Sequence, residues 1–379
     1  MTPACSSSLA HPFTIAYPIP APSHYHRLVS DNRPIAEPVA PTPDPITAPP
    51  APTLNALFFG DDGLRAGWSV LVFLILVVVV GIAGGALIAH FHLIPKTAVP
   101  QPGVQAIFTA RFAAIDKLFE FLLFAIPAIL MSLIERRPFT RYGLATRRML
   151  PDFLTGLFWG FAALSLLVGA LYLNHAIVFE GILLHSPTAL IYAAKWGLVF
   201  FLVGIGEEFW FRGYLLYTVC RGVAGIARTM NPRAPRSHLI GFLVAASLFG
   251  VGLFMLAHLG NGGETFVGIF QVGLVGAVFS FSLYRTGSLW WAIGVHTAWD
   301  WAQSYFYGTA DSGIIAVGHL LATHPLGSRL LSGGDDGPEG SVLGIPTLLL
   351  LAVVIHFTLP RRGYPLPPDP SPPPPGDLH

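Results

Sequence analysis

Two neighbouring glutamates and an arginine, Glu207, Glu208 and Arg212, stand at the end of a long apolar stretch, residues 190–206, that contains one charged residue. A charged side chain at membrane depth costs roughly 2.5–3.5 kcal/mol on insertion scales, so such groups persist mainly where they pair or work. Glu208 and Arg212 are four residues apart, so they share a helix face and can pair. Glu207 is rotated by about 100° and has no partner in its own helix. We therefore interpret Glu208 and Arg212 as structural support, and Glu207 as a carboxylate that points into a cavity.

Two later apolar stretches carry further polar residues: His258 ends one of them, and His296 and Asp300 lie four residues apart in the other. That spacing projects an imidazole and a carboxylate from one helix face, as in metal ligation or in the fixing of a histidine tautomer. Peptide hydrolysis needs a general base for water, and hydrogen-bond donors or a metal for the oxyanion. We expect Glu207 to be the base. His258 and His296 then either bind a divalent metal together with Asp300, with zinc as a candidate, or donate hydrogen bonds to the tetrahedral intermediate.

The composition indicates the environment in which this chemistry takes place. Charged residues make up 11% of the 379 residues and hydrophobic residues 53%, whereas soluble domains carry about 25% charged residues. The chain is therefore expected to be a membrane protein. Its net charge of +1 leaves no broad basic face, which argues against nucleic acid as a partner. With only Cys5 and Cys220, a metal would need histidine and carboxylate ligands.

Hydropathy predicts an all-α, polytopic transmembrane helix bundle of about eight spans, each near the ~20 residues needed to cross a bilayer. The fourth segment is overlong and is expected to project beyond the hydrocarbon. At the start of the second, Asp116, Lys117 and Glu120 are interpreted as an interfacial ion cluster. The predicted segments are 67–93, 115–135, 152–174, 189–219, 239–259, 265–284, 288–306 and 342–359.

Both ends of the chain are rich in proline. Residues 1–60 are predicted to be a disordered cytoplasmic arm and residues 360–379 a disordered tail, because neither has the apolar periodicity needed to pack. The transmembrane bundle is placed at residues 61–359.

The arginines give a predicted orientation in the cell membrane. In an eight-span arrangement twelve of them fall on one side, and the positive-inside rule then places both termini in the cytoplasm. The cavity is expected to open to the same side. A fifth segment that starts at 239 would put His258 near the opposite face from Glu207, so this segment is expected to be tilted or to start below the interface. The twelve are Arg136, Arg137, Arg141, Arg147, Arg148, Arg221, Arg228, Arg233, Arg236, Arg285, Arg361 and Arg362.

Three motifs occur in order on the fourth, fifth and seventh predicted segments: Glu207-Glu208-x-x-x-Arg212, Phe254-x-x-x-His258 and His296-x-x-x-Asp300. In this respect the chain resembles the CPBP intramembrane proteases, which include the type II CAAX prenyl endopeptidases and Abi-like bacteriocin-processing or immunity relatives. The resemblance covers about residues 115–306. The family's fourth position is more often Asn, so Asp300 adds a negative charge.

The resemblance implies a glutamate-dependent, metalloprotease-type endopeptidase inside the membrane. Its partners would be the lipid bilayer and a membrane-embedded peptide or lipoprotein substrate. Glu207 would be the base, and His258 and His296 would be catalytic or metal-binding. Two alternatives from other classes are a non-catalytic membrane scaffold or bacteriocin immunity protein, and a proton-coupled transporter, because buried acids and histidines also form proton relays.

Overall fold

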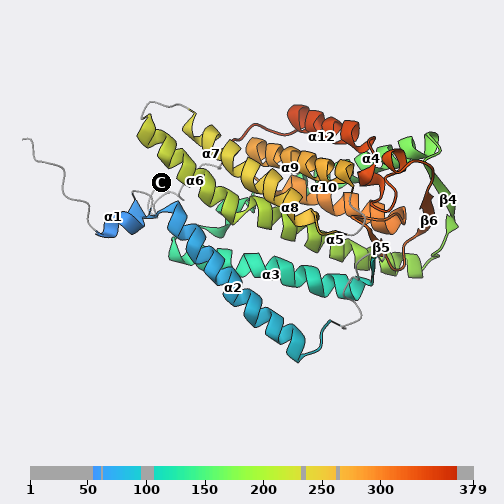
Figure 1. The fold of residues 1–379 in the computed structure, drawn as a ribbon, viewed down its shortest axis with the longest axis horizontal. Helices are drawn as coiled ribbons and strands as arrows, with labels where there is room; N and C mark the ends of the chain where they lie inside the picture. Colours follow the sequence, from blue (N-terminus) through green and yellow to red (C-terminus); the bar gives the residue numbers. More distant parts are fainter. Residues whose placement is uncertain (1–53, 61–62, 95–105, 232–235, 262–264, 365–379) are drawn as a thin grey trace, which may run out of the picture. The chain divides into compact units, whose positions relative to one another are not determined.

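The computed structural model describes residues 54–60, 63–94, 106–231, 236–261 and 265–364, and this part of the chain is mainly helical (Figure 1). The predicted proline-rich arms lie outside the described residues except for 54–60, where α1 and β1 form, and 360–364. The α-helices are α1 (Leu54–Phe58), α2 (Ala66–His90), α3 (Ala110–Ile134), α4 (Met149–Leu173), α5 (Thr188–Arg212), α6 (Tyr214–Met230), α7 (Ser237–Ala245), α8 (Phe254–His258), α9 (Phe266–Thr286), α10 (Trp290–Asp300), α11 (Arg329–Ser332) and α12 (Gly344–Thr358).

Short strands and non-α helical turns connect these helices. Strands β3 and β5 pair in parallel, and β4 and β6 pair antiparallel, with Ile177 opposite Pro325 and Ile182 opposite Leu321. The strands are β1 (Phe59–Gly60), β2 (Gly63–Leu64), β3 (Ala106–Phe108), β4 (Ile177–Ile182), β5 (Ile314–Ala316) and β6 (Leu321–Pro325). The turns are the 3₁₀ helices η2 (Phe139–Tyr142) and η5 (Pro338–Gly340) and the π-helices η3 (Ala246–Leu253) and η4 (Trp301–Phe306).

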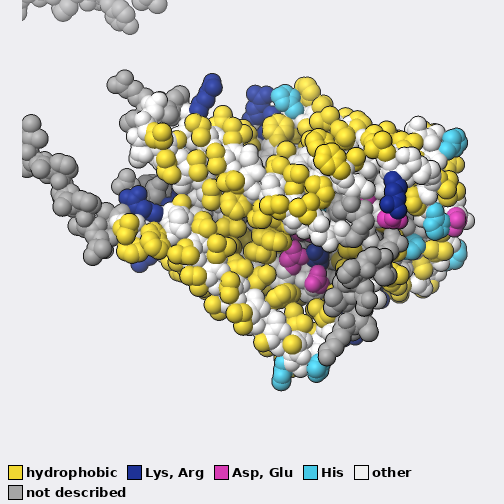
Figure 2. Space-filling model, in the orientation of Figure 1, with side chains coloured by type: hydrophobic (Ala, Val, Ile, Leu, Met, Phe, Trp, Pro, Cys, Tyr) yellow, Lys and Arg dark blue, Asp and Glu magenta, His cyan; other side chains and the backbone are white. Residues whose placement is uncertain are grey.

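Within the described residues, six helical segments are long and apolar enough to cross a membrane, so this is a multi-pass membrane protein. The predicted count of eight is not confirmed, because α10 and α12 contain 11 and 15 residues. One face of the molecule is largely hydrophobic (Figure 2), as expected for a surface in contact with lipid. The six segments are 66–90, 110–134, 149–173, 188–230, 237–258 and 266–286.

The overlong fourth segment is two helices, because α5 ends and α6 begins at Gly213. A Cβ at Gly213 would lie 2.3 Å from the carbonyl oxygen of Phe209, so this break requires glycine. The fifth segment is also interrupted, since the π-helix η3 separates α7 from α8. Single π turns inside α-helices often occur at functional sites.

Glycines allow α10 to pack against both α4 and α5 at backbone distance. A Cβ at Gly160 of α4 would lie 2.3 Å from the Val295 carbonyl oxygen, and one at Gly294 would lie 2.3 Å from the Phe153 carbonyl oxygen. On the other side, a Cβ at Gly204 of α5 would lie 2.8 Å from Thr297 Oγ1. These close approaches place the middle of α10 beside the last two turns of α5, where the two glutamates lie.

Candidate active site

The buried pair Glu208–Arg212 anchors the end of α5. Arg212 Nη1 lies 2.9 Å from Glu208 Oε1, and neither side chain has solvent exposure. The second guanidinium nitrogen donates to the carbonyl oxygen of Gly250 in η3 at 3.0 Å, and the guanidinium lies 4.8 Å from the centre of the Phe254 ring. The spacing of the two residues predicts this ion pair, and the structure adds a contact that joins α5 to the fifth segment.

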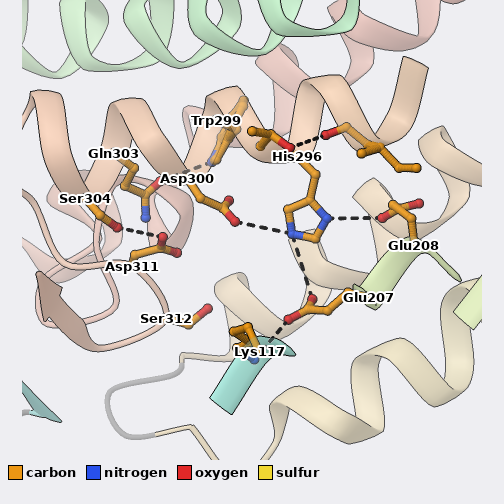
Figure 3. A network of polar contacts seen from close by, with 12 residues as sticks. Lys117, Glu207, Glu208, His296, Trp299, Asp300, Gln303, Ser304, Asp311 and Ser312 are labelled. Atoms are coloured by element: carbon orange, nitrogen blue, oxygen red, sulfur yellow. Dashed lines mark hydrogen bonds and ion pairs between the residues drawn. The ribbon is translucent and has the colours of Figure 1, made fainter. Parts of the chain in front are cut away.

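His296 lies between three carboxylates (Figure 3). Its Nδ1 is 3.2 Å from Glu208 Oε1, while its Nε2 is 3.5 Å from Asp300 Oδ2 and 3.8 Å from Glu207 Oε2. The helix geometry of α10 brings Asp300 to His296, and the packing of α10 on α5 brings both glutamates. The two ring nitrogens both face acceptors, and both can donate at once only when the imidazole is protonated.

Lys117 and Glu120 of α3 belong to the same network, although the sequence-based interpretation places them in an interfacial ion cluster. Lys117 Nζ lies 2.8 Å from Glu120 Oε2 and 3.5 Å from Glu207 Oε1. Both residues line the same cavity as Glu207. The sequence could have indicated their place in the site. A lysine and a glutamate three residues apart in an apolar helix are as costly to bury as Glu207 and Glu208, so they too are expected to pair or to work.

The four predicted site residues all line one cavity of about 280 Å³: Glu207, His258, His296 and Asp300. Figure 2 shows acidic and basic side chains in a hollow of the otherwise hydrophobic face. His258 shares the cavity with Glu207, so the two residues do not lie at opposite faces of the bundle. The pairing of Arg212 with Gly250 explains this, because it aligns the end of α5 with the middle of the fifth segment.

His258 enters the cavity in a fixed orientation. Its Nδ1 lies 2.8 Å from the Phe254 carbonyl oxygen, and its ring packs edge-on against the Phe254 ring at 4.6 Å. Because Nδ1 faces an acceptor, it carries the proton in the neutral ring, and Nε2 is left with a lone pair.

Residues that the motifs do not include complete the lining. Ser304 donates a hydrogen bond to Asp311 at 2.8 Å, and the Ser312 hydroxyl donates to Glu339 at 3.0 Å. Burial raises the pKa of the Asp311 carboxyl to about 6. No short motif contains these residues: Ser304 lies in η4, and Asp311, Ser312 and Glu339 follow it and reach the cavity only through the fold.

The opening of the cavity toward the arginine-bearing loops, which the sequence-based hypothesis expects, stays a prediction. Phe209, Phe211 and Arg212 form a buried layer at the end of α5. Trp210 stacks on Phe124 of α3 at 4.5 Å, which extends this layer.

The residues proposed as metal ligands have suitable tautomers but are not arranged as a ligand set. A metal-binding histidine usually donates its other ring N–H to a carbonyl or carboxylate, as His258 and His296 do. In the described part of the chain, however, no group of three or more His, Cys, Asp or Glu side chains converges on one point where a metal would bind. The described residues therefore offer no set of three ligands, and the divalent metal stays a prediction.

Among known proteins, one family model matches part of the chain. Residues 188–302 match the family model of the type II CAAX prenyl endopeptidase Rce1-like proteins. The match runs from the start of α5 into η4, and it contains all seven residues of the three motifs. No curated protein and no solved structure matches the chain.

Residues 188–302, within a bundle that has six helical segments able to cross a membrane, are therefore similar to the CAAX-type intramembrane proteases. The predicted resemblance to the CPBP and CAAX protease family is confirmed over this segment.

Proposed function

We propose that this protein is a glutamate-dependent intramembrane endopeptidase that cleaves membrane-bound or lipidated peptides. The observation that carries the proposal is the position of His296, whose Nε2 faces both Glu207 and Asp300 at the wall of one cavity. A carboxylate that can accept a proton and an imidazole that can stabilise negative charge are the two components that amide hydrolysis requires.

Each group has a defined task in this mechanism. The Glu207 carboxylate takes a proton from water, and the water oxygen forms a bond to the carbonyl carbon of the substrate. The electron pair of the carbonyl π bond moves to its oxygen, which His296 and His258 stabilise by donating hydrogen bonds. When the intermediate collapses, the C–N bond breaks and the leaving nitrogen takes the proton from Glu207, so the base is regenerated.

The surrounding charges support this assignment. Lys117 lies 3.5 Å from Glu207 and favours the ionised carboxylate that acts as a base. Glu208 and Asp300 each face one ring nitrogen of His296, and the ion pair with Arg212 orients Glu208. His258 and His296 donate from Nε2 only as imidazolium, because Nδ1 of each already faces an oxygen.

The proposal is tested by a comparison of protein termini in membranes that contain wild-type protein or Glu207→Gln at matched levels. New termini are expected only with the wild type, because the near-isosteric amide cannot accept the proton. Wild-type termini in membranes containing folded Glu207→Gln would refute the assignment of the base. If cells that carry Glu207→Gln instead show the same phenotype as cells that carry the wild type, a scaffold or immunity role would be supported.

The divalent metal predicted from the sequence, with zinc as a candidate, has a separate test. Metal bound by neutral histidines and hydrogen bonds donated by imidazolium require opposite protonation states. Elemental analysis of purified wild-type protein and His296→Ala distinguishes metal binding from hydrogen-bond donation by the histidines. Stoichiometric metal in the wild type alone would support ligation by His296.

The orientation is also part of the proposal. We place both termini, and the arginine-bearing loops, on the cytoplasmic side of the cell membrane.

A further inference from the structure

Three helix ends meet at one end of the bundle and bring arginines together. Arg285 in the last turn of α9 donates to the Leu359 carbonyl oxygen, just after α12, and the Arg362 backbone N–H donates to the Arg285 carbonyl oxygen at 2.7 Å. Arg362 Nη1 lies 4.0 Å from Oδ2 of Asp152, a residue in the first turn of α4. The ends of α9 and α12 and the start of α4 therefore lie together.

Three further arginines surround this junction. Arg148, the residue before α4, lies 3.1 Å from Asp152, and Arg361 is near enough for its charge to repel that of Arg285. Figure 2 shows basic side chains grouped beside the position that α12 has in Figure 1. We call the five residues the arginine cluster: Arg147, Arg148, Arg285, Arg361 and Arg362.

Most of the positive charge of the arginine cluster is not compensated. Among the described residues, Asp152 is the only carboxylate within 4.0 Å of its side-chain nitrogens. Burial lowers the pKa of the Arg362 guanidinium, an effect that Asp152 opposes, and the charges of Arg148 and Arg147 lower that pKa further. The N-terminal end of α4 adds partial positive charge, and no side chain caps it. The cluster therefore attracts an anion from outside the chain.

A strip of apolar side chains leads away from the arginine cluster along α4. Leu150, Leu154 and Phe158 are spaced four residues apart, so they share one helix face, and each is more than half exposed. Asp152 is buried on the opposite face, toward the ends of α9 and α12. Positive charge at a helix end next to an exposed apolar strip matches a molecule that has an anionic head and a hydrocarbon tail.

We infer that the arginine cluster binds the phosphate headgroup of an anionic glycerophospholipid, with one acyl chain along Leu150, Leu154 and Phe158. Basic pockets between transmembrane helices bind such headgroups. Arginine suits this role because its planar fork of donors can bind two phosphate oxygens at once.

The lipid site is separate from the candidate active site. None of the residues of the arginine cluster or of the apolar strip lines the cavity. The bound lipid ties the start of α4 to the ends of α9 and α12, and α4 packs at backbone distance against α10, which carries His296. The inference does not depend on the proposed protease activity.

Native mass spectrometry of the purified, delipidated chain in detergent tests the inference. The probes are dioleoylphosphatidylglycerol, dioleoylphosphatidylcholine with the same acyl chains, and glycerol 3-phosphate without any. The test variant, Arg147→Gln/Arg361→Gln, removes two exposed arginines that pair with no carboxylate of the described residues. The matched control, Arg228→Gln/Arg236→Gln, removes the same charge from exposed positions on α6 and just before α7.

The wild type should retain phosphatidylglycerol in preference to phosphatidylcholine. Each basic residue near an anionic headgroup contributes about fivefold to affinity, so the test variant should bind phosphatidylglycerol about 25-fold more weakly. The control variant should bind it like the wild type. Arg147→Lys/Arg361→Lys should keep most of the affinity, because both charges remain.

Three results would overturn the inference. Equal retention of the two phospholipids by the wild type would show that the headgroup charge is not recognised. An equal loss in the test and control variants would indicate a general effect of net charge. Glycerol 3-phosphate that binds as tightly as phosphatidylglycerol would show a site for free phosphate and not for a lipid.

Discussion

The buried ion pair between Glu208 and Arg212 makes a quantitative prediction about stability. Both side chains have no solvent exposure, and their atoms approach to 2.9 Å. The removal of one partner from such a pair leaves an uncompensated charge and costs about 3–5 kcal/mol. Arg212→Gln should therefore lower the free energy of unfolding by about that amount, or the melting temperature by on the order of 10 °C.

The double mutant separates charge compensation from simple loss of packing. In Glu208→Gln/Arg212→Gln the charge on both residues is gone and two amides can still hydrogen-bond, so much of the lost stability should return. Coupled residues in one network show interaction energies of about 0.5–3 kcal/mol in such cycles. Arg212→Lys should give an intermediate result, because a lysine keeps the charge but cannot also reach the Gly250 carbonyl oxygen with a second fixed donor.

Unfolding of the purified protein in mixed detergent micelles, followed by tryptophan fluorescence, measures these differences. The exposed Arg228 on α6 provides the matched control, and Arg228→Gln should change stability little. Two outcomes would contradict a stabilising ion pair. One is an Arg212→Gln variant that unfolds like the wild type. The other is a double mutant whose loss of unfolding free energy equals the sum of the losses in Glu208→Gln and Arg212→Gln.

Three further predictions concern the cavity, the helix packing and a buried loop carboxylate. Lys117→Gln should slow the appearance of new termini by about 10–100-fold, because Glu207 loses the cation that holds it, whereas Lys195→Gln, beside Tyr192, should not. Gly160→Ala should destabilise the protein by about 1–3 kcal/mol through its clash with the backbone of α10, measured by thermal unfolding in detergent, whereas a Cβ at Gly169 of the same helix meets no atom within 4 Å. Burial raises the pKa of Asp336 to about 6, above its unfolded value, so its contribution to stability is complete below about pH 4 and is lost as the pH rises through 6. Asp336→Asn should therefore flatten the stability profile between pH 4 and 7 by about 1–3 kcal/mol in unfolding experiments at a series of pH values.

Each of these has a contrary outcome. Equal rates for Lys117→Gln and the wild type would show that Glu207 is held by other groups. Equal stability of the Gly160 and Gly169 alanine variants would contradict the close packing of α4 on α10. An unchanged pH profile in Asp336→Asn would mean that another group titrates in that range.

Some of the site follows from local geometry, and the sequence determines that part. Residues four apart on a helix share a face whatever surrounds them, so the pairs Glu208–Arg212 and His296–Asp300 could be predicted from spacing alone. The membrane class follows from composition, and the family from the order of three motifs. Hydropathy also locates the six long spans, because the hydrophobic effect acts on each segment separately.

Tertiary structure alone decided how the elements meet. The contact of Glu208 with His296 joins residues 88 positions apart, and it depends on glycines that let α10 approach α5 and α4 at backbone distance. The inclusion of Lys117 in the network depends on the packing of α3, so a local interpretation assigns it to the interface. The lining of the cavity also includes Asp311 and Ser312, which only the fold brings to it. Hydropathy contains no such information, because it gives the length of a segment and not the neighbours of its side chains.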